Sequence, residues 1–125
     1  MASTLKHTFS HTVDGVALPF IGSLVKSLSV DELVPFKIEK ADDGDDTTFS
    51  ELLGTGEFST ITALLITSDR AIKLRLNDQS DGHIPISAAG WVVLTDVAID
   101  DATSKVKVNN NSGAAAVISG YIAGT

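Results

Sequence analysis

The sequence predicts an all-β protein: one jelly-roll-like β-sandwich domain over residues 1–125, with about eight to ten short strands and at most one or two helical turns. Three observations lead to this prediction. Apolar and polar residues alternate with period two through much of the chain, which places every second side chain on one face of a strand. Glycine, aspartate and asparagine clusters interrupt this alternation at short intervals. A length of 125 residues is also enough for one domain with one hydrophobic core.

The first predicted strand covers residues 4–13. One of its faces is apolar apart from two histidines, and it consists of Leu5, His7, Phe9, His11 and Val13. Asp14-Gly15 then supplies a turn, because glycine tolerates the positive φ angles that such turns require. Residues 16–22 follow as a short extended piece, which Pro19 weakens. The chain therefore begins with extended structure on both sides of one turn.

Two short segments leave a helical turn open as an alternative. Ser29–Glu32 has the spacing of a capping box, and Pro35 would end a helix there soon after it began. Thr48–Glu51 has the same spacing, and both a short helix and a bent strand are consistent with it. Residues 36–40 alternate apolar and charged side chains, which predicts a strand.

Residues 59–67 and 71–77 predict the clearest hairpin of the chain, with a turn at residues 68–70. In the second of these strands the inward face is expected to carry Ile72, Leu74 and Leu76.

The C-terminal third predicts three strands in sequence. A polar loop over residues 78–85 precedes a strand at 90–100, one face of which carries Trp91, Val93, Thr95, Val97 and Ile99. Residues 104–108 form the next strand, a turn follows at 109–113, and residues 114–124 close the chain. The small residues of this last strand would let another sheet or another chain approach closely.

Composition limits the partners and the compartment. Nine basic and 16 acidic residues give a formal net charge of −7, so phosphate backbones and anionic membrane surfaces should repel the molecule. There is no cysteine, no secretory-signal pattern at the start, and no apolar run near the ~20 residues of a membrane helix. We therefore expect a soluble protein made in the cytoplasm that binds neither nucleic acid nor membranes. Because only 20% of its residues are charged, part of its surface is expected to be covered by a partner.

The stretch ADDGDD, residues 41–46, raises the question of a calcium site or a plain turn. An EF-hand loop needs glycine at its sixth position and glutamate at its twelfth, whereas here the glycine is third from Asp42 and the twelfth residue is Leu53. A looser calcium site that includes Glu51 remains an alternative. The favoured interpretation is an exposed, mobile hairpin tip, the aspartates of which bond to their own backbone.

The other candidate residues do not combine into a reactive site. His7 and His11 would lie about 13 Å apart on a strand and could not share one ion, and His83 is predicted to be solvated in a loop. Residues 54–56 (GTG) lack the third glycine of a dinucleotide fingerprint. Asn110–Ser112 matches a glycosylation sequon and is interpreted as a turn. We therefore expect no catalytic, cofactor-binding or metal-ligating residues, no cofactor, and no enzymatic activity.

Two aromatic residues suggest a carbohydrate platform. Exposed aromatic side chains can stack on sugar rings, and Trp91 and Tyr121 are the candidates. Because Trp91 begins an apolar strand, burial in the core or in an interface is its favoured role.

The C-terminal half carries a family resemblance. It reads STITALLITSDRAIKLRLN, then HIPISAAGWVVLTDVAI, then VKVNNNSGAAAVISGYIAGT. The shared elements are a strand ending in LRLN, an IPI segment before a glycine and an apolar strand, and an asparagine-small-glycine turn before an Ala/Val-rich last strand. In these features the chain resembles small structural proteins of tailed bacteriophage virions, over about half of its length.

The resemblance implies a role in assembly. Proteins of this kind are capsid decoration, head-fibre or tail-associated β-sandwiches and are often trimeric. The chain is accordingly expected to reside in the virion, to self-associate as a homotrimer and to pack on other virion proteins. The alternative is a β-sandwich module that binds a glycan or a receptor.

Overall fold

The computed structural model describes residues 3–10, 12–17, 23–52, 59–77, 82–100 and 106–125, and all regular structure within them is β-strand. The strands are β1 (Ser3–Ser10), β2 (Thr12–Val13), β3 (Val16–Ala17), β4 (Ser23–Val30), β5 (Glu32–Lys40), β6 (Ser50–Glu51), β7 (Thr60–Ser68), β8 (Ile72–Leu76), β9 (Ile84–Ile86), β10 (Trp91–Asp100), β11 (Val106–Asn109) and β12 (Ala116–Gly124). In the described ranges there is no helix long and apolar enough to cross a membrane. His11, Pro19 and residues 54–56 lie outside the described residues.

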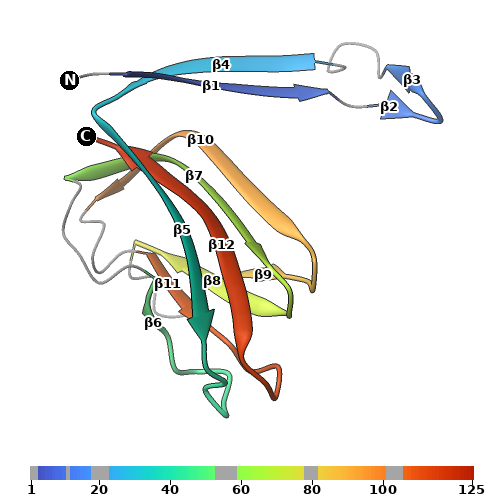
Figure 1. The fold of residues 1–125 in the computed structure, drawn as a ribbon, viewed down its shortest axis with the longest axis vertical. Helices are drawn as coiled ribbons and strands as arrows, with labels where there is room; N and C mark the ends of the chain where they lie inside the picture. Colours follow the sequence, from blue (N-terminus) through green and yellow to red (C-terminus); the bar gives the residue numbers. More distant parts are fainter. Residues whose placement is uncertain (1–2, 11, 18–22, 53–58, 78–81, 101–105) are drawn as a thin grey trace.

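Strands β5 to β12 form two antiparallel sheets that pack face to face (Figure 1). The strand order is β10-β7-β12-β5 in one sheet and β6-β11-β8-β9 in the other. Among these strands β8 and β9 alone are both consecutive and paired, whereas every other connection leads to the opposite sheet. This is the strand order of a jelly roll. The predicted single sandwich is therefore confirmed.

The hydrophobic core lies between the inner faces of the two sheets. Its fully buried side chains come from both sheets and include Ile61, Leu64, Ile66, Ile118 and Ile122 on one side and Leu74, Val106 and Val108 on the other. Val34, Phe36 and Ile38 of β5 pack against this core at its margin. Both sheets contribute to the core because alternation with period two places the apolar side chains of each strand on its inner face.

The predicted hairpin of residues 59–77 is wrong in its pairing. Both strands exist, and Ile72 and Leu74 are buried as expected, but β7 pairs with β10 and β12 while β8 pairs with β11 and β9. The turn after Ser68 thus carries the chain from one sheet to the other. Local sequence indicates the turn but not the partner, because strand pairing is decided by which distant edges are free.

The prediction that Trp91, Val93, Thr95, Val97 and Ile99 share one face of β10 is also wrong. Val92 and Leu94 pack against the core, so that Trp91 and Val93 point to the opposite side. The register with β7 then shifts between Thr95 and Ile99, around Asp96 with a φ of 57°. Between these two pairs β10 advances four residues while β7 advances two, and beyond this bulge Val97 and Ile99 face the core.

Both segments that left a helical turn open are extended. The chain around Ser29–Glu32 is strand β4, a bend at Asp31, and strand β5. Pro35 is accommodated because β5 is an edge strand, paired with β12 alone, so its missing N–H removes no ladder bond on the open side. Ser50 and Glu51 form β6, which is the strand alternative. The predicted polar loop at 78–85 is corrected at its end, where Ile84 and Pro85 belong to β9.

The N-terminal strands form an arm outside the jelly roll. We define the arm as β1 to β4: β1 pairs with β4 over their whole length, and β2 pairs with β3 around the predicted turn at Asp14-Gly15, which have φ angles of 52° and 79°. The arm crosses one end of the body, passes β10 and projects beyond it (Figure 1). At its base, the backbone N–H of Asp31 donates to the carbonyl of Gly124, 2.9 Å away.

The small residues of β12 fit a close approach within its own sheet. β12 lies between β7 and β5. Gly120 has a φ of 154°, and a Cβ there would stand 1.8 Å from the carbonyl oxygen of Leu65 on β7. A Cβ at Gly124 would stand 2.1 Å from the carbonyl oxygen of Thr60. The neighbour that needs this space is therefore strand β7.

A Gly120→Ala variant should be strongly destabilised. The added Cβ must push the two strands apart, which should lower the free energy of unfolding by about 3 kcal/mol. Gly113→Ala is the matched control, because Gly113 has a φ of 88° but no atom within 4 Å of an added Cβ. Only the conformational cost remains there, about 1 kcal/mol. Urea unfolding of both variants measures the difference, and equal losses would contradict the close approach.

Candidate interaction surface

The sheet β10-β7-β12-β5 has an outer face, opposite the core, on which side chains line up in three rows across the strands. Following the register from β10 to β5, the first row is Trp91, Thr67, Ser119 and Lys37, the second is Val93, Leu65, Tyr121 and Pro35, and the third is Thr95, Ala63, Ala123 and Leu33. The second row contains no charged residue. An outer face of an antiparallel sheet is normally the polar one, so this row indicates a covered surface.

The base of the arm covers the two alanines in the middle of the third row. Leu28 and Val30 of β4, with Leu5 of β1, form a small buried cluster with Ala63 and Ala123. Alanines at these two positions let the arm lie close to the sheet. This cluster is a second, smaller core that fixes the arm to the body.

Two polar contacts extend this attachment towards the second row. The Nε2 atom of His7 and the hydroxyl of Tyr121 form a hydrogen bond. Further along, the ammonium of Lys26 lies 2.7 Å from the carboxylate of Asp96 on the bulge of β10. Both side chains of this ion pair are about half exposed or more, so it contributes at most about 1 kcal/mol.

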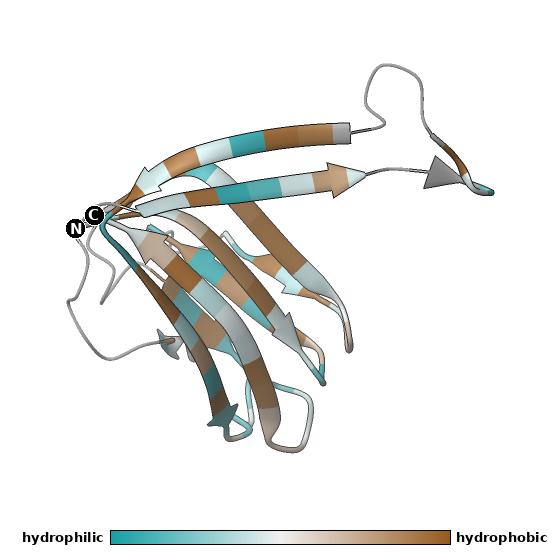
Figure 2. Cartoon of the chain, turned by 45° about the horizontal axis from the view of Figure 1, so that its top comes forward, coloured by the Kyte–Doolittle hydropathy of each residue, from teal (hydrophilic) through white to brown (hydrophobic). Residues whose placement is uncertain are grey.

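Burial decreases along the arm beyond these contacts. Leu28 is 9% exposed at the base, whereas Leu24 and Val25 near the other end of β4 are 50% and 57% exposed and Val16 is 69% exposed. In Figure 2 the part of β4 that projects beyond the body carries hydrophobic colouring. Trp91, 63% exposed on the outer face, adds a large aromatic side chain. Trp91 is therefore not buried in the core of its own chain, and its burial in an interface stays a prediction.

Burial shifts the pKa of both partners in the His7–Tyr121 pair. Loss of water lowers the pKa of His7 below its ordinary value of 6.5 and raises that of the Tyr121 hydroxyl, because in each case it disfavours the charged form. The Nδ1 atom of His7 finds no hydrogen-bond partner among the described residues. Burial therefore favours the uncharged form of both side chains.

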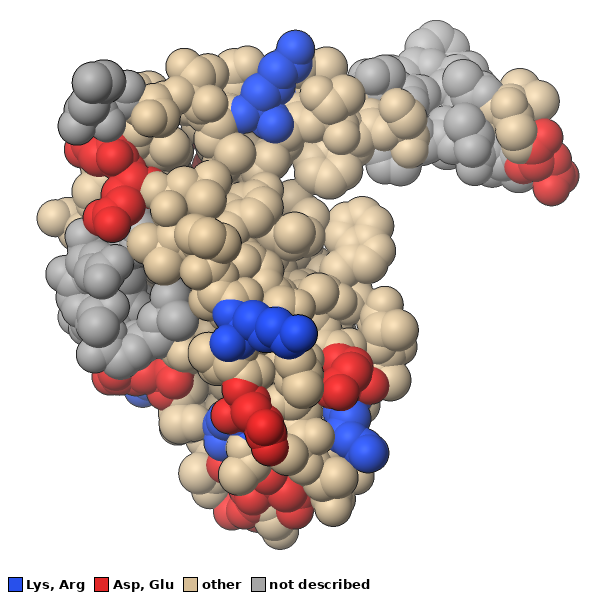
Figure 3. All heavy atoms as spheres, in the orientation of Figure 1, with Lys and Arg blue, Asp and Glu red and all other residues tan. Residues whose placement is uncertain are grey.

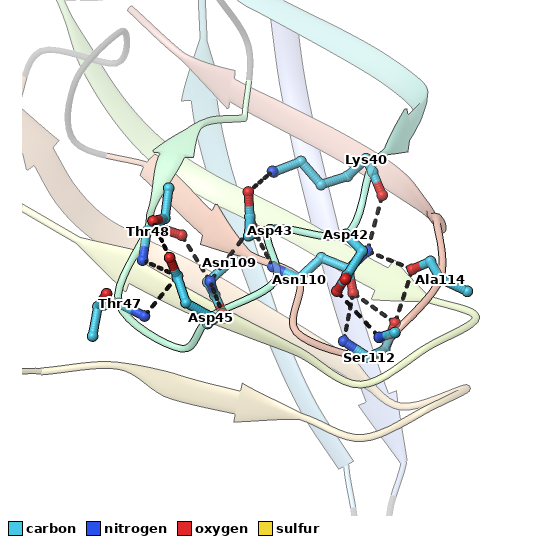
Figure 4. Close-up of polar contacts among 11 residues, drawn as sticks. Lys40, Asp42, Asp43, Asp45, Thr47, Thr48, Asn109, Asn110, Ser112 and Ala114 are labelled. Carbon is cyan, nitrogen blue, oxygen red and sulfur yellow. Dashed lines mark hydrogen bonds and ion pairs between the residues drawn. The ribbon is translucent and has the colours of Figure 1, made fainter.

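The acidic stretch 41–46 is docked against the loop before β12 (Figure 4). The carboxylate of Asp43 accepts hydrogen bonds from the Lys40 ammonium, 2.6 Å away, and from the backbone N–H of Asn110, 2.8 Å away. Asp42 accepts from the backbone N–H of Gly113 at 3.1 Å. The interpretation of this stretch as an exposed, mobile tip is therefore wrong for Asp43, which is largely buried.

Asp45 does what the sequence predicts for a turn aspartate. Its carboxylate accepts from the hydroxyl of Thr48 and from the backbone N–H groups of Thr48 and Thr47. These hydrogen bonds, that of the hydroxyl first, lower the pKa of Asp45.

Two buried asparagines complete the loop network. The amide of Asn109 donates to the carbonyls of Asp45 and Thr48, and that of Asn110 donates to the carbonyls of Lys40 and Ala114. Sequence reasoning identified the turn but not this anchoring role. The only available signal was three successive asparagines before a glycine.

Within the described ranges, no three histidine, aspartate or glutamate residues come close enough to hold a metal ion. The carboxylate oxygens of Asp42, Asp43 and Asp45 are directed at N–H and O–H donors. His83 is exposed beside a shallow depression of β8 and β9, far along the chain from His7. Trp91 and Tyr121 lie on the same outer face, but in different rows.

No family model, curated protein or solved structure matches the chain.

An Asp43→Ala variant should lose about 2 kcal/mol of unfolding free energy. The change leaves the backbone N–H of Asn110 and the Lys40 ammonium without their acceptor in a largely buried place. Asp46→Ala is the control, since Asp46 is exposed and accepts no hydrogen bond from the described residues, and it should change stability by no more than about 0.5 kcal/mol. Similar melting temperatures for the two variants would show that the loop is not anchored by Asp43.

Acidification should weaken the arm through His7. Because the pKa of His7 is lowered in the folded protein, its stabilising contribution is complete above the unfolded pKa of 6.5 and is lost as the pH falls through the folded value. Protonation would also place a charge opposite Lys26, its cross-strand partner. The melting temperature of the wild type should fall more between pH 7.5 and 5.5 than that of His7→Gln. Parallel curves would exclude this role for His7.

Proposed function

We propose that this chain is a structural protein of a bacteriophage virion, which self-associates as a homotrimer and packs on other virion subunits as a capsid decoration or tail and neck component. The observation that carries the proposal is the concentration of exposed apolar side chains on the projecting arm and the adjoining outer face. Such surfaces mark sites of protein association.

The architecture is consistent with this role. Jelly rolls recur in viral capsid proteins and in lectins. Here the body is stabilised without disulfides, by a sandwich core and a hydrogen-bonded loop network at one end. The arm extends the contact surface well beyond that body (Figure 1). Together with the sequence resemblance of the C-terminal half, these features favour an assembly protein.

The direct test is the protein content of purified particles. Particles produced from the genome that encodes this chain should contain it in many copies, and electron cryo-microscopy should locate a jelly roll of this size with its arm in contact with neighbouring subunits. If particles produced from that intact genome are complete and infectious but do not contain the chain, the proposal is contradicted.

A glycan- or receptor-binding module is the second candidate, and the exposure of Trp91 favours it. Trp91 pairs with Thr67, one of the residues around a shallow depression that also includes Lys37, Asp69 and Ser119. An exposed indole beside polar groups can bind one sugar face. A glycan array should separate the two functions: specific binding that is lost in Trp91→Ala supports the module, and binding unaffected by this change argues against it.

A further inference from the structure

The arm and the open part of the outer face are complementary surfaces on the same molecule. We propose that the arm of one copy docks on the outer face of a second copy, with Phe9 and Leu24 of the arm against Trp91, Val93 and Leu65 of the neighbour. This inference rests on the self-association in the proposed function and specifies its interface. The ligand of the surface is thus a second copy of this chain.

The distal part of the arm repeats the chemistry of its base. Leu5 pairs with Leu28 at the base, and two steps of the alternation further along Phe9 pairs with Leu24, so all four side chains lie on one face of the β1–β4 ribbon. At the base this face is buried on Ala63 and Ala123 of the chain's own sheet. At Leu24 the same face is half exposed. The face therefore continues past the end of its intramolecular partner.

A ribbon of this kind needs a partner along its length. The sheet of β1 and β4 has only these two strands, and an isolated two-stranded hairpin is at best marginally stable in water. The base is packed on the body, and His7 and Lys26 each add one polar contact, but Leu24 beyond them is half exposed. Docking on a neighbouring copy would give the distal half of the ribbon a surface on which to pack.

The outer face offers the matching surface. The arm covers Ala63 and Ala123 of its third row, and the second row and Trp91 of the first row lie outside this cluster. Figure 3 shows a notch between the projecting arm and the body. Trp91 is 63% exposed, and Val93 and Leu65 are partly exposed. These residues have the same apolar character as Ala63 and Ala123, on which the chain's own arm rests.

Charge complementarity favours a second copy as the occupant. Residues 1–30 carry Lys6 and Lys26 against Asp14, a formal charge of +1, whereas residues 31–125 carry seven basic and 15 acidic residues, a charge of −8. A mildly basic arm and an acidic body attract each other between copies, as Lys26 and Asp96 do within one copy.

An arm-to-face contact joins two different surfaces, so each copy can both give an arm and receive one. Such a head-to-tail interface forms a closed ring if its rotation closes, and a trimer is one such ring.

Two single-surface variants test the interface. Leu24→Asp disables the arm and Trp91→Asp disables the face, and each should weaken self-association roughly tenfold or more in native mass spectrometry and light scattering. Ile84→Asp is the matched control, because Ile84 is 36% exposed but lies on β9 of the opposite sheet, and it should assemble like the wild type. Circular dichroism and melting temperatures establish that all variants are folded.

Mixing the two disabled variants decides the geometry. A Trp91→Asp arm can still dock on a Leu24→Asp face, so the mixture should form a heterodimer and stop there. A wild type that stays monomeric at 100 μM, single variants that assemble like the wild type, or a mixture that forms no heterodimer would each overturn the inference. If the chain is monomeric in solution but is present in purified particles, the inferred contact between copies is wrong and the proposed virion role is not. The arm would then dock on another virion protein.

A second measurement does not depend on weakened binding. The chain has no cysteine, so Leu24→Cys and Val93→Cys variants each carry a single thiol. A short bismaleimide should link the two variants to each other in a mixture far more than it links either variant to itself. Equal linkage in all three samples would overturn the arm-to-face contact.

Discussion

The structure depends on the central position of β12, the last strand of the chain, between β7 and β5. Ile118 and Ile122 fill the sandwich core from one side of this strand, while Tyr121 and Ala123 receive the arm on the other. The carbonyl of Gly124 also anchors the bend at Asp31, from which the arm leaves the body. Gly120 permits the strand to lie this close to β7, because a side chain there would meet the carbonyl of Leu65.

At one end of the sandwich, polar groups join the loop after β5 to the loop between β11 and β12. Buried asparagines and an aspartate are costly unless every donor and acceptor is paired, and here backbone carbonyls and N–H groups of two loops supply most of the partners. The acidic stretch thus has a structural role that could not be inferred from its charge. Asp45 and Asp46 remain in water, whereas Asp43 holds the two loops together.

The opposite end of the sheet carries the arm and the exposed apolar side chains. There the arm is fixed by a few apolar contacts and by His7 and Tyr121, and beyond these contacts its apolar side chains face water. Leu24, Val25 and Trp91 are exposed in a chain whose formal net charge is −7. Exposed apolar side chains of this kind mark sites of protein association. This combination suits a subunit of an assembly.

The sequence by itself determined the all-β class, the positions of most strands, and the turn at Asp14-Gly15, because alternation and turn chemistry are local properties of the chain. It also indicated that Asp45 would bond to its own backbone. Tertiary structure alone decided that β7 and β8 belong to different sheets and that Asp43 would be anchored by Asn110. The exposure of Trp91 was likewise decided there, since the bulge at Asp96 reverses which side chains of β10 face the core. The physical reason is the same in each case: pairing, register and burial depend on free energies between segments that are distant in the chain, and no local pattern contains them.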